Sequence, residues 1–115
     1  MTIKIKTIKK RTEFIKIKSS GKILTSNSMI IQKLFDKDLN NSIKIGYTAT
    51  KSLGNAVKRN RAKRLMRVLV REVMEEYGKV NFSYVLIAKN SIFNKSIDKL
   101  KEELIKLLKK NEKNN

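Results

Sequence analysis

The chain has 115 residues, enough for one domain with a single core, and its 28 Lys and Arg against 10 Asp and Glu give a formal net charge of +18. A compact protein tolerates such a charge mainly beside a polyanion, and nucleic acid is the default partner. Because Cys and His are absent, disulfides, thiolate nucleophiles, thiolate or imidazole metal sites and the commonest general base are excluded.

The first half of the chain predicts one short helix among strands. Residues 1–8 alternate Ile and Lys, so we expect either a frayed strand or a mobile basic arm. Thr12 is a candidate cap for a helix that runs through about Lys18, with Phe14 on its apolar face. Three strands follow, at residues 22–25, 28–35 and 43–49, and the last of them alternates strictly, as a half-buried strand does.

The second half predicts a long helix, a strand and a final helix. The long helix stops at Gly78, the apolar run 82–88 has the pattern of a strand covered on both faces, and the final helix spans about 95–110. We expect residues 111–115 to fray. The strands on either side of the long helix should lie parallel in one sheet. The sequence therefore predicts a single α/β domain over residues 1–115, a two-layer sandwich whose mixed sheet of about four strands is covered by helices.

The long helix has two very different faces. Its residues 58–71 (KRNRAKRLMRVLVR) carry seven cations and no acid. At ~100° per residue, one face is apolar, with Ala62, Leu65, Met66, Leu69, Val70 and Val73, and the other is polar, with Asn60, Arg61, Lys63, Arg64, Arg67 and Arg71. The cations crowd the start of the helix, which opposes the helix dipole but suits a bound phosphate. An ordinary solvated face is the alternative, and we favour a face that meets a polyanion.

Two enzymatic interpretations are weak. The segment Gly46–Ser52 superficially suggests a phosphate-binding loop, but its spacing is one residue short and the second glycine is missing. Glu72, Glu75 and Glu76 end the long helix and could recruit a metal for a protein-only nuclease, although surface carboxylates among lysines are more often ion-pair partners. We therefore expect no catalytic residue and no metal site in the chain itself.

A specific motif leads into the long helix. Gly54-Asn55-Ala56-Val57 is followed, after one residue each time, by Arg59-Asn60-Arg61 and Lys63-Arg64, and then after two residues by Arg67. This spaced run closely resembles the signature of the bacterial ribonuclease P protein subunit. The resemblance extends over most of the chain and includes an early basic helix with Phe14, the Ile45-Gly46 strand and the apolar strand that ends at Ala88-Lys89.

The resemblance implies a protein cofactor for a catalytic RNA. Members of that family bind the ribonuclease P RNA and the 5′ leader of precursor tRNA, and the holoenzyme removes the leader with magnesium held mainly by the RNA. The resemblance also implies an α/β sandwich with a left-handed strand–helix–strand crossover, where the general rule predicts a right-handed one. By position, the RNA-binding residues would be Asn55, Lys58, Arg59, Asn60, Arg61, Lys63, Arg64, Arg67 and Arg71. Phe14, Lys51 and Lys89 would line the cleft that holds the leader.

Three positions of this expected cleft depart from the family. Lys18 and Gln32 stand where the family often has aromatic residues, and Ser52 stands where a second Lys is common. We therefore expect fewer stacking surfaces and one cation less in the cleft. Phe14 could instead be a core aromatic, and the two cleft lysines could be solvated residues at strand ends.

Other partners and locations follow from what the sequence lacks. A membrane surface is a weaker alternative to RNA, because no stretch approaches the ~20 apolar residues of a membrane span. The basic N-terminus lacks the apolar region of a secretory signal, so we expect a cytoplasmic protein. A small basic ribosomal or RNA-chaperone protein is the main alternative, and it would not require the spacing of residues 54–67. Nothing in the sequence requires a protein oligomer.

Overall fold

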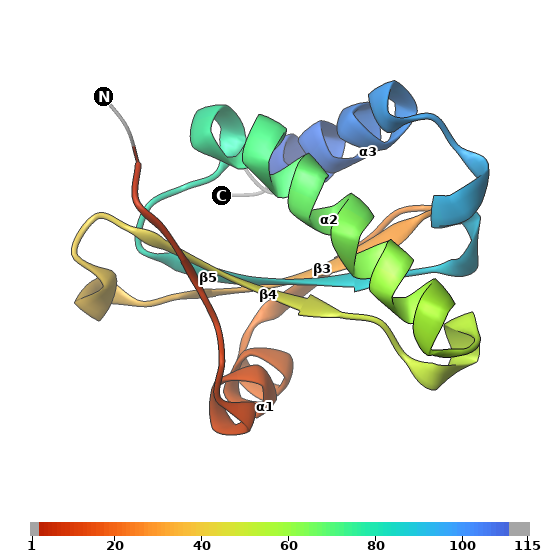
Figure 1. The fold of residues 1–115 in the computed structure, drawn as a ribbon. Helices are drawn as coiled ribbons and strands as arrows, with labels where there is room; N and C mark the ends of the chain where they lie inside the picture. The colour runs from red at the N-terminus through yellow and green to blue at the C-terminus, as the bar shows by residue number, and fades with distance from the viewer. Residues whose placement is uncertain (1–2, 111–115) are drawn as a thin grey trace.

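The chain forms a mixed five-stranded sheet with helices on both of its faces (Figure 1). The computed structural model describes residues 3–110. Its strands and α-helices are β1 (Ile5–Thr7), α1 (Arg11–Ser20), β2 (Lys22–Thr25), β3 (Met29–Phe35), β4 (Ile43–Thr48), α2 (Ala56–Tyr77), β5 (Phe82–Ala88) and α3 (Ile97–Lys110). Short 3-10 helices lie between them: η1 (Lys37–Leu39), η2 (Lys51–Leu53) and η3 (Asn90–Asn94). The predicted fraying of residues 111–115 lies outside the described residues.

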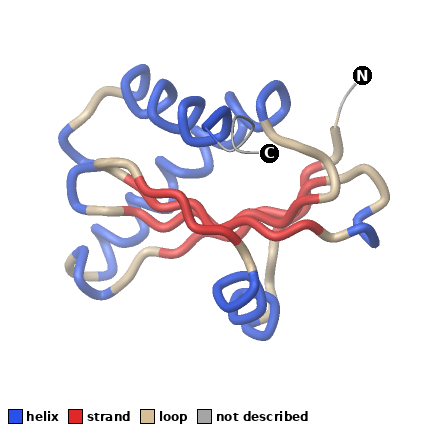
Figure 2. Tube along the Cα trace, turned by 180° about the vertical axis from the view of Figure 1, so that it is seen from behind, coloured by secondary structure: helices blue, strands red, loops and turns tan. Residues whose placement is uncertain are grey.

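The strand order is β1-β4-β5-β3-β2. β4 pairs in parallel with both β1 and β5, whereas β3 is antiparallel to β5 and to β2. α2 and α3 lie side by side on one face of the sheet and α1 lies on the other (Figures 1 and 2). The predicted α/β sandwich is confirmed, with β1 as a fifth strand and α1 as partial cover for the second face.

The crossover from β4 through α2 to β5 is left-handed. In the view of Figure 1, β4 runs from left to right near the viewer, α2 returns above the sheet from right to left, and β5 runs from left to right behind β4. This path turns anticlockwise as it recedes from the viewer. The family resemblance is therefore a better guide at this point than the general preference for right-handed crossovers.

The main core lies between the sheet and the layer formed by α2 and α3. The apolar faces predicted for both helices point into it, and their buried residues include Ala62, Met66, Leu69, Val70, Val73, Leu100, Leu104, Leu107 and Leu108. Burying a large aliphatic side chain stabilises the folded state by about 1.5–3 kcal/mol. α2 is thus anchored along its apolar side, and its cationic side is left on the outside of the molecule.

β5 is almost continuously apolar, with Ser83 as its polar interruption, because each of its faces meets a different cluster. Tyr84 and Leu86 point into the main core. Val85, which alternates with them, packs with Ile8 and Ile17 on the face that α1 covers. The prediction of a strand covered on both faces is confirmed.

Residues 5–7 form the edge strand β1 and not a mobile arm. Ile5 lies opposite Ile43 of β4, and the Ile8 N–H donates to the carbonyl of Ile45 at 2.8 Å. Ile8 itself is buried. Of the two alternatives for residues 1–8, the strand is therefore correct for residues 5–7. Residues 1 and 2 lie outside the described range.

The predicted start of the first helix is wrong. α1 begins at Arg11, and Lys10 occupies the N-cap position without a side-chain hydrogen bond, so Thr12 is inside the first turn and does not cap it. The helix ends at Ser20, two residues beyond its predicted limit at about Lys18.

The remaining elements lie within two residues of their predicted limits, which is the usual spread for element ends. The exceptions are the 3-10 helices η1, η2 and η3, which form where no regular structure was predicted, and η3 brings Phe93 beside α2. No helix within residues 3–110 combines the length and the apolar character needed to cross a membrane.

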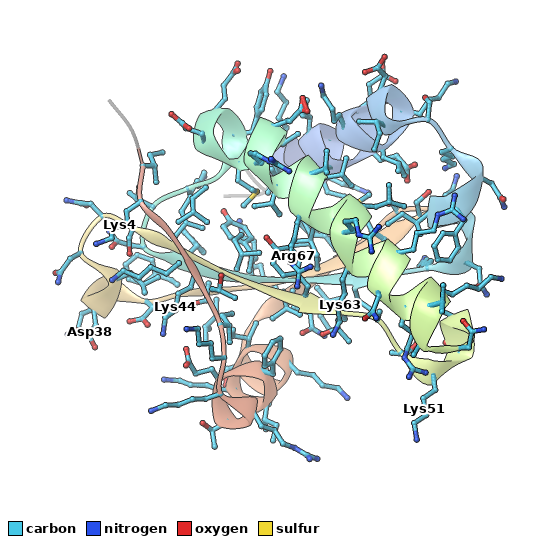
Figure 3. All side chains as sticks on the ribbon, viewed as in Figure 1. Lys4, Asp38, Lys44, Lys51, Lys63 and Arg67 are labelled. Carbon is cyan, nitrogen blue, oxygen red and sulfur yellow. The ribbon has the colours of Figure 1, made fainter. Side chains whose placement is uncertain are left out.

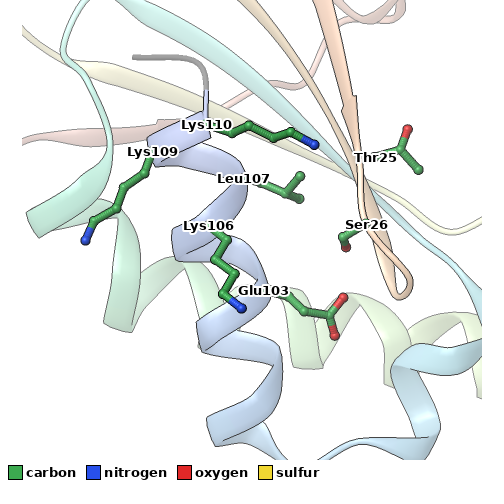
Figure 4. A pocket seen from close by; sticks show the side chains of 7 residues that line it. All are labelled: Thr25, Ser26, Glu103, Lys106, Leu107, Lys109 and Lys110. Atoms are coloured by element: carbon green, nitrogen blue, oxygen red, sulfur yellow. The ribbon is translucent and has the colours of Figure 1, made fainter. Parts of the chain in front are cut away.

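A shielded carboxylate ties α3 to the turn between β2 and β3. Glu103 accepts hydrogen bonds from the N–H and Oγ of Ser28, at 3.1 and 2.9 Å, and from Nζ of Lys95 at 2.8 Å. Figure 4 shows Glu103 directed from α3 toward this turn, beside a hollow of about 490 Å³. Burial alone raises the pKa of Glu103, but hydrogen bonds from Lys95, Ser26 and Ser28 outweigh it and hold the pKa below its ordinary value of 4.5.

We expect Glu103→Gln to lower the free energy of unfolding by about 1–2 kcal/mol near neutral pH, because an amide replaces a charged acceptor. Since the folded-state pKa is lowered, the stability contributed by the carboxylate is fully present above the unfolded-state pKa and is lost as the pH falls through the folded-state pKa. Urea unfolding of both proteins from about pH 7 down to about pH 3 should show their difference shrink only at the acidic end. A difference that stays constant would contradict this role.

Candidate nucleic-acid interface

The residues just before α2 set the direction in which this helix begins. Gly54 has a φ of 130°, a conformation that favours glycine, and a Cβ there would lie 2.9 Å from Cδ of Lys58. Asn55 caps the helix, because its Oδ1 accepts the N–H of Lys58 at 3.0 Å. Nη1 of Arg59 donates to the carbonyl of Gly54 at 3.1 Å. The Gly-Asn pair of the motif therefore has a structural role, and contact of Asn55 with RNA stays a prediction.

The polar side of α2 forms one surface, which we call the cationic face: Lys58, Arg59, Asn60, Arg61, Lys63, Arg64, Arg67 and Arg71. Each of these residues is exposed or half-buried. Figure 3 shows Lys63 and Arg67 on the side of α2 that overlooks β4. Within residues 3–110, none of the seven cations lies within 4.0 Å of a carboxylate, and the ion pairs there involve other lysines, Lys44, Lys95 and Lys101. The cationic face is neither packed in the interior nor neutralised by the described acidic groups.

The ring of Phe93 supports the first turns of the cationic face. Its centroid lies 5.5 Å from Cζ of Arg61 and 5.8 Å from Nζ of Lys58. At such distances an aromatic face attracts a cation without cancelling its charge. The sequence analysis missed Phe93, because it lies in η3, a segment with no helical or strand pattern, and only the three-dimensional structure places it beside α2.

Tyr47 of β4 supports the middle of the cationic face in the same way. Cζ of Arg67 lies 5.5 Å from the centroid of the Tyr47 ring. Burial raises the pKa of the Tyr47 hydroxyl, while the charges of Arg67 and Arg71 oppose that rise. The phenol is therefore neutral near neutral pH and places no negative charge beside the arginines. The sequence analysis did not connect Tyr47 with Arg67, because the two residues lie on different elements.

A groove lies on the opposite face of the sheet, between α1 and the central strands. It encloses about 300 Å³, and the residues that line it include Arg11, Phe14, Lys18, Gln32, Thr50 and Val85. The Phe14 ring lies directly over Gly46, where an added Cβ would be 2.5 Å from Cε1 of Phe14. Phe14 also packs on the small cluster around Ile8. Both interpretations of Phe14 therefore apply, since it is partly a core residue and partly a wall of the groove.

The structure brings only part of the predicted cleft together. Phe14 lines the groove, and Lys51 is exposed at the start of η2, one residue beyond Thr50 of the lining. Lys89 is engaged elsewhere, because its Nζ donates to the carbonyl of Ser26 at 2.7 Å in the turn between β2 and β3. That any of these residues contacts a leader stays a prediction.

The groove also contains a cation that the sequence analysis did not select. Arg11 joins Phe14 and Lys18 in the lining, and these three residues follow the spacing i, i+3 and i+7 of one helical face. That spacing was visible in the sequence and could have identified Arg11. Lys18 and Gln32, the positions that depart from the family, both line the groove, so they replace aromatic walls with polar ones.

We expect Gly46→Ala to lower the free energy of unfolding by about 1–3 kcal/mol, because the new methyl group must displace the Phe14 ring. Urea denaturation measures the loss. Phe14→Ala makes room for the methyl group, so the double variant should lose less stability than the sum of the two single variants. Strict additivity would show that the ring and the glycine are not coupled.

The carboxylates at the end of α2 are not arranged as a metal site. Among the described residues there is no group of three or more acidic side chains that could hold a metal ion. Glu72 accepts a hydrogen bond from Nζ of Lys101 at 3.2 Å and so joins α2 to α3, while Glu75 and Glu76 are exposed. This arrangement favours the ion-pair interpretation over a protein-only nuclease.

The fold and the cationic face define a class of protein, the small, strongly basic α/β sandwich with a left-handed crossover and an arginine-rich central helix turned outward. Residues 3–112 match the family model described as Ribonuclease P. The chain belongs to the ribonuclease P protein family. It is thus a protein component of ribonuclease P, an endoribonuclease complex of tRNA processing in which the protein has an RNA partner.

Relatives and solved structures agree with this assignment. The chain is 36% identical over 103 residues to the ribonuclease P protein component of Gluconacetobacter diazotrophicus, covering 90% of this chain and 88% of that one. It is 33% identical over 107 residues to that of Ruegeria pomeroyi, covering 92% and 86%. The fold matches the RNase P protein from Thermotoga maritima with a TM-score of 0.78 at 22% identity, covering 91% and 96%. It matches the RNase P protein from Staphylococcus aureus with a TM-score of 0.76 at 23% identity, covering 90% and 92%.

Proposed function

We propose that this protein binds both the catalytic RNA of ribonuclease P and the 5′ leader of precursor tRNA, and so promotes removal of the leader to give mature tRNA 5′ ends. The observation that carries this proposal is the cationic face of α2, which bears the family motif and has no carboxylate partner among residues 3–110. A protein that keeps seven cations together without such partners is suited to a polyanion.

The cationic face is the surface that we assign to the catalytic RNA. The guanidinium groups of Arg59, Arg61 and Arg64 can each make forked contacts to phosphate oxygens, which a lysine cannot. Asn60 offers both a donor and an acceptor to a ribose or base edge. The rings of Phe93 and Tyr47 contact three of the cations, which restricts their side chains and reduces the loss of conformational entropy on binding.

The groove beneath α1 is the surface that we assign to the leader. A leader is single-stranded, and such strands are held by a positive groove combined with aromatic platforms. Arg11 and Lys18 supply the charge, Phe14 supplies one aromatic wall, and Gln32 offers hydrogen bonds to base edges. With one aromatic residue in the lining, the groove holds the strand mainly by charge, and we expect little preference for leader sequence.

In this proposal the RNA subunit performs the catalysis and holds most of the magnesium. The chain suits that division, because it contains no His or Cys and because its described carboxylates do not gather into a metal site. The protein cations lower the repulsion between substrate and catalytic RNA, so magnesium ions occupy their sites at a lower concentration. One copy of the protein suffices, since both surfaces lie on one chain.

Reconstitution with the cognate catalytic RNA tests the proposal. We expect no cleavage of precursor tRNA by the protein alone, and cleavage at a magnesium concentration where the RNA alone is inactive once the protein is added. Gel analysis of end-labelled precursor tRNA gives both results. Cleavage by the purified protein without RNA, or no effect of the protein on the magnesium requirement, would contradict the proposed division of labour.

A further inference from the structure

A second hollow, of about 240 Å³, lies where β3 ends and β5 begins, and Phe35 and Phe82 form its aromatic wall. The two rings meet edge to face, with centroids 5.5 Å apart and planes inclined at 73°. Phe35 is 59% exposed. Single exposed apolar residues are ordinary, but here a partner ring holds Phe35 in place and leaves much of its surface to solvent.

Three lysines also line this hollow. We call the surface the Phe35 patch and define it as Lys22, Lys33, Phe35, Lys79 and Phe82. Lys33 is only 5% exposed, and its Nζ lies 4.7 Å from the centroid of the Phe82 ring. Of residues 3–110, no acidic side chain lines the hollow. Asp36 follows Phe35 in the chain, but its Oδ1 accepts the N–H of Asp38 at 3.0 Å. The Phe35 patch thus places a partly exposed aromatic ring beside lysine side chains, of which Lys22 is exposed.

The Phe35 patch is distinct from both surfaces described above. Lys79 follows the end of α2, whereas the cationic face ends at Arg71, six residues or about 9 Å before the last helical residue, Tyr77. Lys33 and Phe35 point to the face of the sheet opposite to Gln32, because successive side chains of a strand alternate. Gln32 belongs to the groove beneath α1.

We propose that the Phe35 patch binds one nucleotide of single-stranded RNA, with the base stacked on Phe35 and the adjoining phosphate beside Lys22. The hollow is smaller than the roughly 300–1,000 Å³ of sites for drug-sized ligands, which suits a single nucleotide. Double-stranded RNA fits poorly, because its paired bases offer no free face for stacking. The inference rests on the proposed function, since the catalytic RNA or the precursor tRNA would supply the nucleotide.

The absence of Trp from the chain allows a direct test. Phe35→Trp creates a single indole fluorophore whose emission a stacked base should quench when a uridine pentanucleotide is added. Ile5→Trp is the matched control, because Ile5 is also exposed and lies between Lys4 and Lys6 at the opposite edge of the sheet. We expect quenching at position 35 and little at position 5. No quenching at position 35, or equal quenching at both positions, would overturn the proposal.

The charge of the Phe35 patch is tested in the same background. Adding Lys22→Gln to Phe35→Trp should weaken the quenching titration roughly tenfold, since a phosphate contact is lost. Adding Lys106→Gln removes the same charge from an exposed position on α3 and should change the titration less than twofold. Equal effects of the two substitutions would overturn the assignment of Lys22 to the site.

The source of the nucleotide is identified with the full RNAs. Catalytic RNA and precursor tRNA are added separately to the Phe35→Trp protein, and the one that quenches the indole supplies the nucleotide, whereas quenching by neither overturns the proposal. Failure here is distinguishable from failure of the proposed function. If only the inference about the Phe35 patch is wrong, the reconstituted cleavage still depends on the protein, but no RNA quenches the indole.

Discussion

Replacing Arg59 and Arg61 together with Ala is expected to weaken binding of the catalytic RNA by about 100- to 10,000-fold. Each substitution removes one charge-assisted contact, worth about 1.5–3 kcal/mol. The two free-energy losses add, so the corresponding factors in the dissociation constant multiply. Both side chains belong to the cationic face and have no carboxylate partner within residues 3–110, so the protein itself loses little stability. Binding of labelled catalytic RNA at fixed salt, and assembly of active holoenzyme, measure the effect.

The matched control for this variant removes two charges elsewhere. Lys99 and Lys106 are exposed on α3, outside both proposed RNA surfaces, and their double replacement with Ala changes the net charge equally. We expect it to weaken binding less than tenfold, because only long-range attraction is lost. Similar losses for both double variants would favour the alternative of a diffuse RNA chaperone, in which no particular arginine matters.

Binding of the catalytic RNA is also expected to fall by about 300- to 20,000-fold between roughly 50 and 200 mM monovalent salt. If ~6–8 cations neutralise phosphates, the release of their counterions gives a slope of about −0.7 to −0.9 per contact in a plot of log affinity against log salt. The cationic face holds seven cations along α2, so one surface provides most of these contacts. A titration of affinity against salt measures the slope.

The same plot counts the contacts that each variant loses. The Arg59→Ala/Arg61→Ala variant should have a slope shallower by about 1.4–1.8, since two phosphate contacts are gone. The Lys99→Ala/Lys106→Ala variant should keep the wild-type slope. A wild-type slope weaker than about −2 would contradict an RNA interface built on the whole cationic face.

The parts of the fold that follow from local periodicity were predictable from the sequence. Met66 and Leu69 repeat at helical spacing and are buried, while Arg64 and Arg67 between and beside them are exposed. The apolar run of β5 needed no partner to be recognised as a covered strand. In both cases the pattern of the chain itself carries the information, because burial repeats with the period of the element.

The parts that depend on distant partners were not predictable. β1 has the same Ile-Lys alternation as a solvated arm would have, and only its pairing with β4 makes it a strand. The cap predicted at Thr12 is wrong because α1 begins at Arg11, with Lys10 at the N-cap position. The hand of the crossover is a property of the whole sheet, and the general rule would have assigned it wrongly.

The residues of the candidate site likewise fall into those predictable from local sequence and those that depend on tertiary structure. The cations of α2 could be listed from the helical wheel and the family motif, since they share one element. Phe93, Tyr47 and Arg11 come from other elements, and their nearness to those cations or to the groove depends on tertiary structure. Lys89 is an error of the opposite kind, because a residue was assigned to the cleft that the structure places elsewhere. Its position at the end of a strand did not indicate that its Nζ donates to the carbonyl of Ser26.

The central position of β5 has a consequence for how the protein is made. Without β5 the sheet separates into two ribbons, β1 with β4 and β3 with β2, and an isolated two-stranded ribbon is marginal in water. β5 follows α2 in the chain, so the nascent polypeptide up to residue 81, with all the arginines of the helix, emerges from the ribosome before a stable core is available. The two ribbons therefore become one stable sheet only after β5 has been synthesised.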